Sequence, residues 1–218
     1  TDWIRGRFQG GVIPPDKKNP VDYVGTPKQR LLCPPNPLWM ELSEVTIAEM
    51  LKTAGYATCH VGKWHLGPDD WYPDKQGFDQ NIGGCDYGQP PGYFDPYERE
   101  GQHGIPTLPP RKKGEYLTDR ESDEAVHFIR THRDAPFFLY MAHYAVHMPV
   151  QGKQELVEKY KKKPPTQQNN PEYAAMVESV DQAVGRLMDV LDELKLAEST
   201  IVIFTSDNGG LLPITNNA

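Results

Sequence analysis

The sequence predicts an α/β fold in which a mostly parallel sheet is flanked by helices. Three segments with apolar residues at helical spacing are each followed by a short run of apolar, β-branched and aromatic residues. Helices that alternate with strands buried on both faces are typical of parallel sheets. With 218 residues, the chain is long enough to form one sizeable domain without needing disulfides or metals merely to fold.

The first helix and the first strand are predicted for residues 46–54 and 56–61. Thr46 and Glu49 have the spacing of a capping box, and an apolar helical face follows them. Residue 55 is a glycine, the residue type that most often follows the end of a helix. We therefore expect a helix that leads directly into a strand.

The second helix and strand follow a long irregular stretch. Thr118 and Glu121 repeat the capping-box spacing ahead of an apolar face that extends to His132. Pro136 stops this helix because proline lacks a backbone N–H donor. The next strand is predicted for residues 137–142.

The third helix has the clearest pattern in the chain. Asn170 is a good N-cap residue, and Pro171 suits the first helical position. Apolar residues then form one stripe that reaches Leu194. After the helix, residues 200–205 are continuously β-branched or aromatic, which predicts a strand covered on both faces.

Two long segments lack steady periodicity and contain many of the 21 prolines and 19 glycines. Residues 1–42 are predicted to be extended or looping, and the length of residues 68–114 indicates a functional or disordered loop. The basic run at residues 159–163 is interpreted as a solvated loop rather than a contact for a polyanion. The formal net charge of −7 argues against a nucleic-acid-binding protein.

The cysteines and the hydropathy of the sequence give no sign of a disulfide-rich, zinc-binding or membrane-spanning protein. Cys33, Cys59 and Cys85 are far apart and odd in number, so they predict neither a disulfide framework nor a zinc motif. No apolar run approaches the ~20 residues that span a bilayer. The chain opens without an initiator methionine or a signal peptide, so we expect a processed start or a piece of a longer protein.

Polar side chains with catalytic potential follow each of the three predicted strands. They are Lys63 and His65, His143 and His147, and Asp207 and Asn208. In open α/β sheets, ligands bind outside the carboxyl ends of the strands. We therefore expect these groups to converge on one site, with His143 in a structural role.

The residue types suggest chemistry on an anionic ester. Lys63 can hold a tetrahedral anion as a point charge, and His65 or His147 can act as an acid or base near neutral pH. Asp207 and Asn208 offer hard oxygen ligands for Ca²⁺ or Mg²⁺, although SDNGG alone is more typical of a turn. Together these residues indicate metal-assisted attack on a sulfate or phosphate ester, and the pattern does not choose between sulfur and phosphorus.

Several motifs resemble those of the type I sulfatases, which have the alkaline-phosphatase-like fold. GYATCHVGKWHLG at residues 55–67 resembles the second signature of this family, and TIVIFTSDNGG at residues 200–210 resembles its metal-binding strand end. Further similar stretches are YLTDRESDEAVHFI, PFFLYMAHYAVHMPVQ and YAAMVESVDQAVGRLMDVLDEL, and TDWIRGR resembles the segment after the nucleophile motif. The likeness covers most of residues 46–210 and is strongest to bacterial members that act on sulfated sugars.

The resemblance implies a role for each strand-end residue. Asp207 and Asn208 would bind Ca²⁺ or Mg²⁺, and Lys63 would contact both the nucleophile and the sulfate. His65 would support the nucleophile and assist breakdown of its sulfated intermediate. His147 would bind sulfate and protonate the leaving oxygen.

The resemblance also implies that residues 69–113 select the sugar or aryl group. Candidate contacts in this loop are Tyr87, Tyr93, Tyr97 and His103, each of which is equally well interpreted as a packing residue.

Parts of the family pattern are missing from the sequence. The family nucleophile is a formylglycine made from the cysteine of Cys-x-Pro-x-Arg, but Cys33 lies in CPPNP, with Pro37 in place of arginine, and is interpreted as incidental. The family also has two adjacent metal-binding aspartates near its amino terminus, a second active-site lysine soon after the Asp-Asn-Gly-Gly strand end and a smaller carboxyl-terminal domain. Residues 1–218 contain none of these at the expected places. Residues 1–218 are therefore predicted to be a partial amino-terminal catalytic domain with an incomplete fold, inactive alone and weak in binding metal.

The resemblance implies a sulfated small molecule or glycan as the substrate and an extracytoplasmic location, periplasmic or secreted. The sequence leaves the oligomeric state open. Two alternatives remain at this point, namely a phosphate or phosphonate monoester hydrolase of the same superfamily and a non-catalytic module that binds sulfated glycans.

Overall fold

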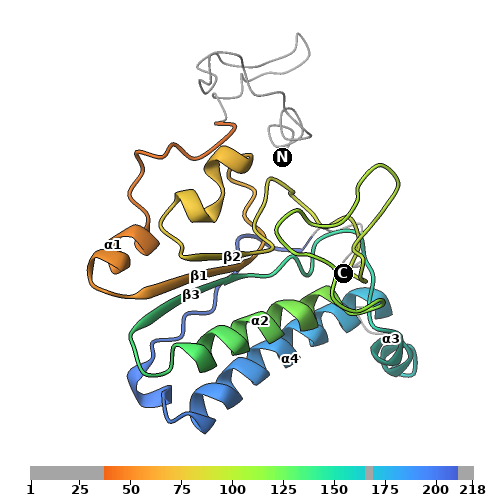
Figure 1. Ribbon diagram of the computed structural model, residues 1–218. Coiled ribbons are helices and arrows are strands. Elements are labelled where there is room, and N and C mark those ends of the chain that lie inside the picture. The colour runs from red at the N-terminus through yellow and green to blue at the C-terminus, as the bar shows by residue number, and fades with distance from the viewer. Residues whose placement is uncertain (1–36, 165–168, 211–218) are drawn as a thin grey trace, which may run out of the picture.

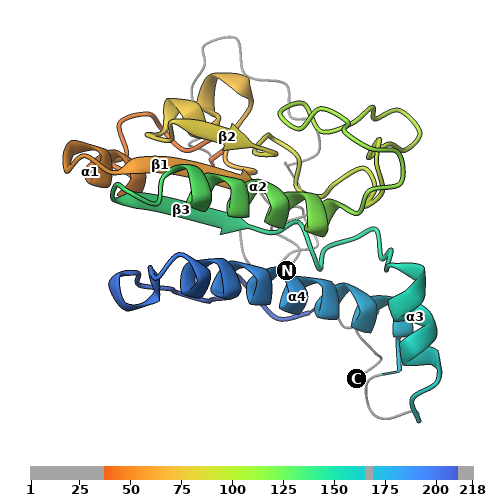
Figure 2. The same ribbon diagram turned by 60° about the horizontal axis from the view of Figure 1, so that its bottom comes forward.

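The computed structural model describes residues 37–164 and 169–210 of the chain. Its centre is a parallel sheet in the order β2-β1-β3, formed by Ala57–Gly62 (β1), Gln80–Ile82 (β2) and Phe137–Ala142 (β3). The sheet lies between α1 and the helix pair α2 and α4 (Figures 1 and 2). The predicted α/β class with a parallel sheet is confirmed.

Helix α1 (Ile47–Thr53) begins and ends as its sequence predicts. The Thr46 side chain accepts a hydrogen bond from the Glu49 N–H, and the Glu49 carboxylate accepts one from the Thr46 N–H at 2.8 Å. The capping box is therefore formed. The strand predicted for residues 56–61 is also present, shifted by one residue.

Helix α2 (Leu117–Thr131) is present, but its predicted capping box is wrong. Tyr116 is the N-cap residue, so Thr118 already lies inside the helix and Glu121 lies too far along it to cap the start. The physical reason is an anchor outside the helix: the Tyr116 hydroxyl donates to the Gln151 carbonyl oxygen, and the Leu117 N–H donates to the Tyr93 carbonyl oxygen.

Helix α4 (Pro171–Glu193) confirms the third predicted helix, and the Asn170 side chain accepts a hydrogen bond from the Tyr173 N–H. A shorter helix, α3 (Gln154–Lys161), was not predicted. It shows that the solvated-loop interpretation of residues 159–163 is wrong for the first three residues, which end this helix. The Lys159 ammonium pairs with Glu178 on α4 at 2.7 Å, which helps to hold the two helices together.

Alternate residues of the strands face opposite sides of the sheet. Cys59 and Val61 of β1 pack against Ala125 and Phe128 of α2. His60 points to the other side, where it lies among aromatic rings. Both faces of β1 are therefore covered, which explains its continuous burial.

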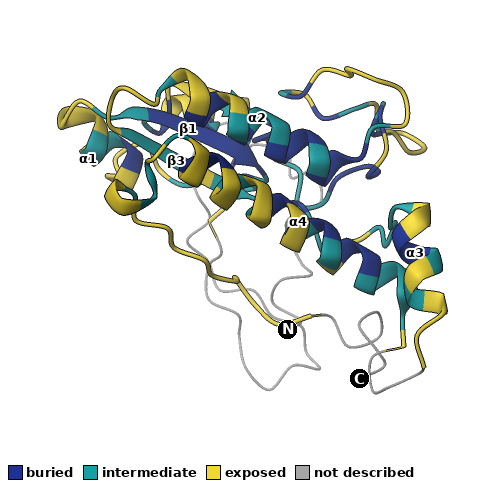
Figure 3. Cartoon of the chain, turned by 90° about the horizontal axis from the view of Figure 1, so that it is seen from below, coloured by how far each residue is buried: buried dark blue, intermediate teal, exposed yellow. Residues whose placement is uncertain are grey.

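The strand predicted for residues 200–205 is absent from the structure. After the short turn Ala197–Ser199, the chain is extended but pairs with no strand of the described residues. Ile201 is 89% exposed and Phe204 is 76% exposed, as the yellow segment after α4 shows (Figure 3). The local sequence favours a strand, but a strand forms only where a neighbouring backbone supplies hydrogen bonds.

The long connection predicted for residues 68–114 is ordered and carries its own core. It contains two single-turn helices, Asp69–Trp71 and Pro73–Lys75, and the unpredicted strand β2, whose polar residues give no strand pattern. Its buried residues pack with the start of α2 and with α4. The residues of the connection in this cluster are Cys85, Tyr93, Tyr97, Ile105 and Leu108, and their partners outside it are Tyr116, Leu117, Tyr144 and Met176.

Residues 37–42, the described part of the predicted irregular segment 1–42, contain no helix or strand. Cys33 lies outside the described residues. Within residues 37–164 and 169–210, no helix is long and apolar enough to cross a membrane.

The buried histidine His60 predicts a pH-dependent stability. Burial lowers its pKa to about 4, below the ordinary 6.5, and neither ring nitrogen has a hydrogen-bond partner among the described residues that would favour the charged form. Between these two pH values the unfolded chain binds a proton that the folded chain does not, so stability is lost as the pH falls. We expect the free energy of unfolding to drop by roughly 2 kcal/mol between neutral pH and pH 5 through this residue.

Urea unfolding at pH 7.5 and pH 5 checks this expectation. His60→Phe removes this titrating group and should reduce the drop in stability by roughly 2 kcal/mol, leaving the part that His65 and His147 contribute. In contrast, His127→Phe on the exposed side of α2 should leave the drop unchanged. An unaltered pH dependence in His60→Phe would show that His60 is not the responsible group.

Candidate functional site

The carboxyl ends of β1 and β3 lie side by side because the two strands are parallel and in register. Gly62 pairs with Ala142, the last residue of β3. The next N–H along β1, that of Lys63, donates to the Ala142 carbonyl oxygen at 2.7 Å. Residues that follow the two strands therefore emerge at the same edge of the sheet.

Gly62 allows this close approach. Its φ is +96°, and a Cβ atom at this position would lie 2.0 Å from the Ala142 carbonyl oxygen. No other residue type fits here without moving one strand away from the other. The turn that presents Lys63 thus depends on glycine.

Lys63 is half-buried at this edge. Burial lowers its pKa, and the negative charge of Asp207 offsets part of this effect. The ammonium group is therefore partly shielded from bulk solvent and lies close enough to Asp207 to respond to its charge.

His65 is held from two directions. Its N–H donates to the Cys85 carbonyl oxygen at 2.9 Å, and its ring packs so closely on Gly88 that a Cβ there would lie 2.7 Å from Cε1. Burial lowers the pKa of His65 to about 4, and the charges of Lys63 and His147 act in the same direction. His65 is thus a neutral imidazole at neutral pH.

His147 follows β3 on an exposed turn. Its Nδ1 lies 3.2 Å from the Met148 carbonyl oxygen, and because a carbonyl only accepts, Nδ1 carries the hydrogen. The exposure of His147 is not complete, and the partial loss of water lowers its pKa; Lys63 acts in the same direction, while the Met148 carbonyl and Asp207 oppose the change. The neutral ring therefore offers Nε2 as an acceptor.

Asp207 approaches the same edge from the segment after α4. Its side chain is exposed, and its charge acts on both Lys63 and His147. The structure thus brings together Lys63, His65, His147 and Asp207, as predicted from the strand ends. Their catalytic roles remain predictions.

Asp207 and Asn208 offer the oxygen ligands that a hard cation prefers, but two residues are too few to complete its coordination shell. The Asn208 Nδ2 donates to Asp207 Oδ1 at 2.9 Å, which leaves the Asn208 side-chain oxygen and one carboxylate oxygen for a ligand. Within the described ranges, no group of three His, Cys, Asp or Glu side chains could hold a metal ion. These two residues supply part of an oxygen shell of the kind that Ca²⁺ prefers.

Two of the predicted substrate contacts are wrong. Tyr93 and Tyr97 are fully buried in the core of the long connection, so neither can reach a ligand. The aromatic residues that suggested a binding loop instead stabilise the loop itself. Tyr87 is half-buried and His103 is exposed, and both remain predictions.

Sequence reasoning missed two carboxylates near the site. Asp86 accepts a hydrogen bond from the Tyr72 hydroxyl at 3.2 Å and raises the pKa of His65 against the effect of burial. Glu121 lies 2.8 Å from His143 Nδ1 and is buried. The structural role predicted for His143 agrees with this contact. No local pattern reveals either carboxylate, because each meets its partner only in the folded chain.

Comparison with known proteins identifies the relatives of this chain. Residues 40–215 match the family model described as Sulfatase. N-acetylgalactosamine-6-sulfatase of Homo sapiens is 36% identical over 187 residues, covering 78% of this chain and 33% of the relative. Arylsulfatase J of Mus musculus is 32% identical over 195 residues, covering 83% of this chain and 31% of the relative. The chain thus spans about a third of the length of these curated relatives.

Solved structures show the same fold. The structure of Ps i-CgsB in complex with k-i-k-neocarrahexaose superposes with a TM-score of 0.67 at 30% identity, covering 80% of this chain and 42% of that chain. A second structure, described as BT33336S-sulf from Bacteroides thetaiotaomicron, gives a TM-score of 0.59 at 26% identity, covering 80% and 47%.

Proposed function

The chain belongs to the sulfatase family, of the type I, alkaline-phosphatase-like class, and we propose that it forms part of the catalytic domain of an enzyme that hydrolyses sulfate monoesters. The observation that carries this proposal is the convergence of Lys63, His65, His147 and Asp207 at one edge of the sheet. Three of these residues, Lys63, His65 and His147, donate backbone hydrogen bonds beside that edge. An anion placed there meets a lysine and two imidazoles.

Each of these residues has a separate role in the hydrolysis of a sulfate ester. Lys63 binds the sulfate oxygens by charge and stabilises the charge that develops on them. His147 presents Nε2, and the negative charge of a bound ester favours its protonation, so that it can donate to the leaving oxygen. His65, a neutral imidazole under burial, can accept a proton when the enzyme is regenerated.

A metal and a nucleophile complete this chemistry. Asp207 and Asn208 would hold part of the shell of Ca²⁺ or Mg²⁺, which supplies charge stabilisation when bound. The sequence of residues 1–218 contains no Cys-x-Pro-x-Arg, from which a formylglycine nucleophile would be made. We therefore propose that residues 1–218 alone release no sulfate and that turnover needs the complete enzyme, meaning a chain that joins these residues to the nucleophile.

A sulfated glycan is the substrate class that the relatives favour. One relative is named an N-acetylgalactosamine-6-sulfatase, and one structural neighbour was solved with k-i-k-neocarrahexaose. On the family resemblance, we also place the enzyme outside the cytoplasm.

Matched esters test the proposed reaction. The complete enzyme should release sulfate from an aryl sulfate or a sulfated oligosaccharide faster than it releases phosphate from the corresponding aryl phosphate. Faster phosphate release would favour the phosphatase alternative. If neither ester turns over while a sulfated oligosaccharide binds in a Lys63-dependent way, the chain is a binding module instead.

A further inference from the structure

Glu121 is a buried carboxylate that does not serve the helix on which it lies. It has the sequence spacing of a capping residue, but α2 begins at Leu117 and its N-cap residue, Tyr116, supplies no side-chain cap. Its side chain is only 2% exposed and points to the end of β3. A carboxylate at such a position requires partners that compensate for the loss of water.

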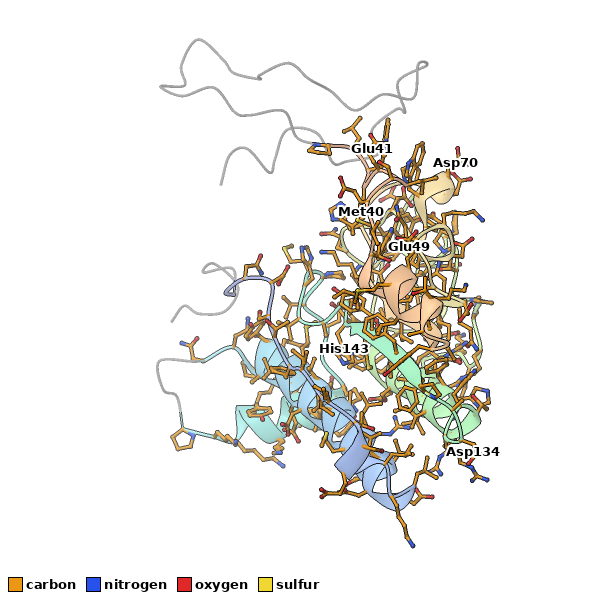
Figure 4. The ribbon with its side chains drawn as sticks, turned by 90° about the vertical axis from the view of Figure 1, so that its left-hand side faces the viewer. Met40, Glu41, Glu49, Asp70, Asp134 and His143 are labelled. Atoms are coloured by element: carbon orange, nitrogen blue, oxygen red, sulfur yellow. The ribbon has the colours of Figure 1, made fainter. Side chains whose placement is uncertain are left out.

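Both oxygens of Glu121 have partners just beyond β3. His143 Nδ1 lies 2.8 Å from Oε2, and the Tyr144 N–H donates to Oε1 at 3.3 Å. A Cβ on Gly62 would lie 3.2 Å from Oε1, so the same carboxylate also touches the end of β1. Figure 4 shows His143 and Asp134 at opposite ends of β3, with His143 at the functional end.

The contacts of Tyr144 connect this carboxylate to His147. The Tyr144 carbonyl oxygen accepts hydrogen bonds from the His147 N–H at 3.0 Å and from the Tyr93 hydroxyl at 2.8 Å. The same hydroxyl lies 2.9 Å from the His147 carbonyl oxygen. The backbone of Tyr144 is therefore held by Glu121 through its N–H and by His147 through its carbonyl oxygen.

We propose that Glu121 and His143 are positioning residues for the sulfate-ester site, and that they fix the turn that presents His147 opposite Lys63. The proposal rests on the function proposed above. Glu121 orients His143 and holds the Tyr144 N–H, so neither residue needs to touch the substrate. Removing this support lets the turn shift, and a displacement of about 1 Å at a reacting group can cost about 100-fold in rate.

Glutamine at position 121 gives a sharp test because its amide has only one accepting oxygen. In Glu121→Gln, the single amide oxygen can accept from only one of the two partners, so either the NH₂ group faces the Tyr144 N–H, or His143 must change tautomer so that Nδ1 accepts from the NH₂ group. Glu124→Gln is a matched control on the same helix. Glu124 pairs with Arg120 at 2.7 Å and makes no contact with the His147 turn that the structure records.

In the complete enzyme, we expect Glu121→Gln to lower kcat for an aryl sulfate by about 10- to 100-fold with little change in KM, and Glu124→Gln to change kcat by less than about 3-fold. Position 143 supplies a second pair of variants should Glu121→Gln fail to fold. His143→Gln keeps a donor for Glu121 and should retain most of the rate, whereas His143→Leu should lose it. Equal rates for His143→Gln and His143→Leu, or a wild-type kcat in Glu121→Gln, would overturn the proposal.

Amide hydrogen exchange separates this proposal from the proposed function, because it needs no turnover. Exchange at Tyr144 and His147 should quicken in Glu121→Gln and stay unchanged in Glu124→Gln. If the wild-type enzyme hydrolyses no sulfate ester but these exchange rates respond as expected, only the proposed function fails. Unchanged exchange in Glu121→Gln would contradict the positioning role even in an active enzyme.

Discussion

Replacing Lys63 by methionine is expected to lower kcat/KM of the complete enzyme for a sulfate ester by about 100- to 1,000-fold, the range seen when one preorganised stabilising group is removed from an active site. Methionine keeps an unbranched apolar side chain of similar length but carries no charge. Lys63 is half-buried and interacts electrostatically with Asp207 and the two imidazoles, at a position where water screens its charge less than at the surface. Initial rates with an aryl sulfate measure the effect.

Lys75→Met is the matched control for this change. Lys75 is fully exposed and pairs with Asp74 at 2.6 Å on the connection after β1. Its replacement should change kcat/KM by less than about 2-fold, because exposed ion pairs contribute little. A Lys63→Met enzyme with the rate of the Lys75→Met enzyme would show that Lys63 does not act on the substrate.

Replacing Gly62 by alanine is expected to destabilise the fold by roughly 3 to 5 kcal/mol, because backbone strain and overpacking add. The new methyl group would lie 2.0 Å from the Ala142 carbonyl oxygen and 2.8 Å from its carbon, both of which belong to the backbone. The strand ends must separate to accommodate it, which breaks the hydrogen bond from the Lys63 N–H. Urea unfolding measures the loss of stability.

Gly55→Ala at the other end of β1 isolates the steric part of this effect. Gly55 also has a positive φ, +83°, but a Cβ there meets nothing within 4 Å. Its replacement should cost only about 1 kcal/mol, the strain of a left-handed conformation. Equal destabilisation by the two changes would show that the close approach of β1 to β3 is not what requires glycine.

The sequence predicts those parts of the fold in which short-range patterns coincide with long-range packing. The capping box at Thr46 forms, and the strand at residues 137–142 has the predicted bounds, because local preference and burial agree there. The strand-end rule also brings Lys63 and His147 to one edge, since parallel strands in register end together.

The start of α2 and the state of residues 200–205 depend on tertiary contacts, which a short sequence pattern does not reveal. Thr118 and Glu121 have the spacing of a capping box, but the anchoring of Tyr116 starts α2 earlier and leaves Glu121 free to meet His143. Residues 200–205 have a strand composition but no paired neighbour among the described residues. In both cases tertiary contacts, or the lack of them, override the local preference.

The convergence of Lys63, His65, His147 and Asp207 on one anion can be tested most directly by locating a bound oxyanion. Crystals of the protein soaked with selenate, whose anomalous scattering marks its position, should show the anion about 3 Å from Lys63 Nζ and from the His147 ring. A competing site is a groove of about 580 Å³ whose lining includes three lysines, Lys112, Lys113 and Lys153, and three carboxylates, Glu115, Asp119 and Glu155. Selenate bound in that groove, with none beside Lys63, would contradict the account.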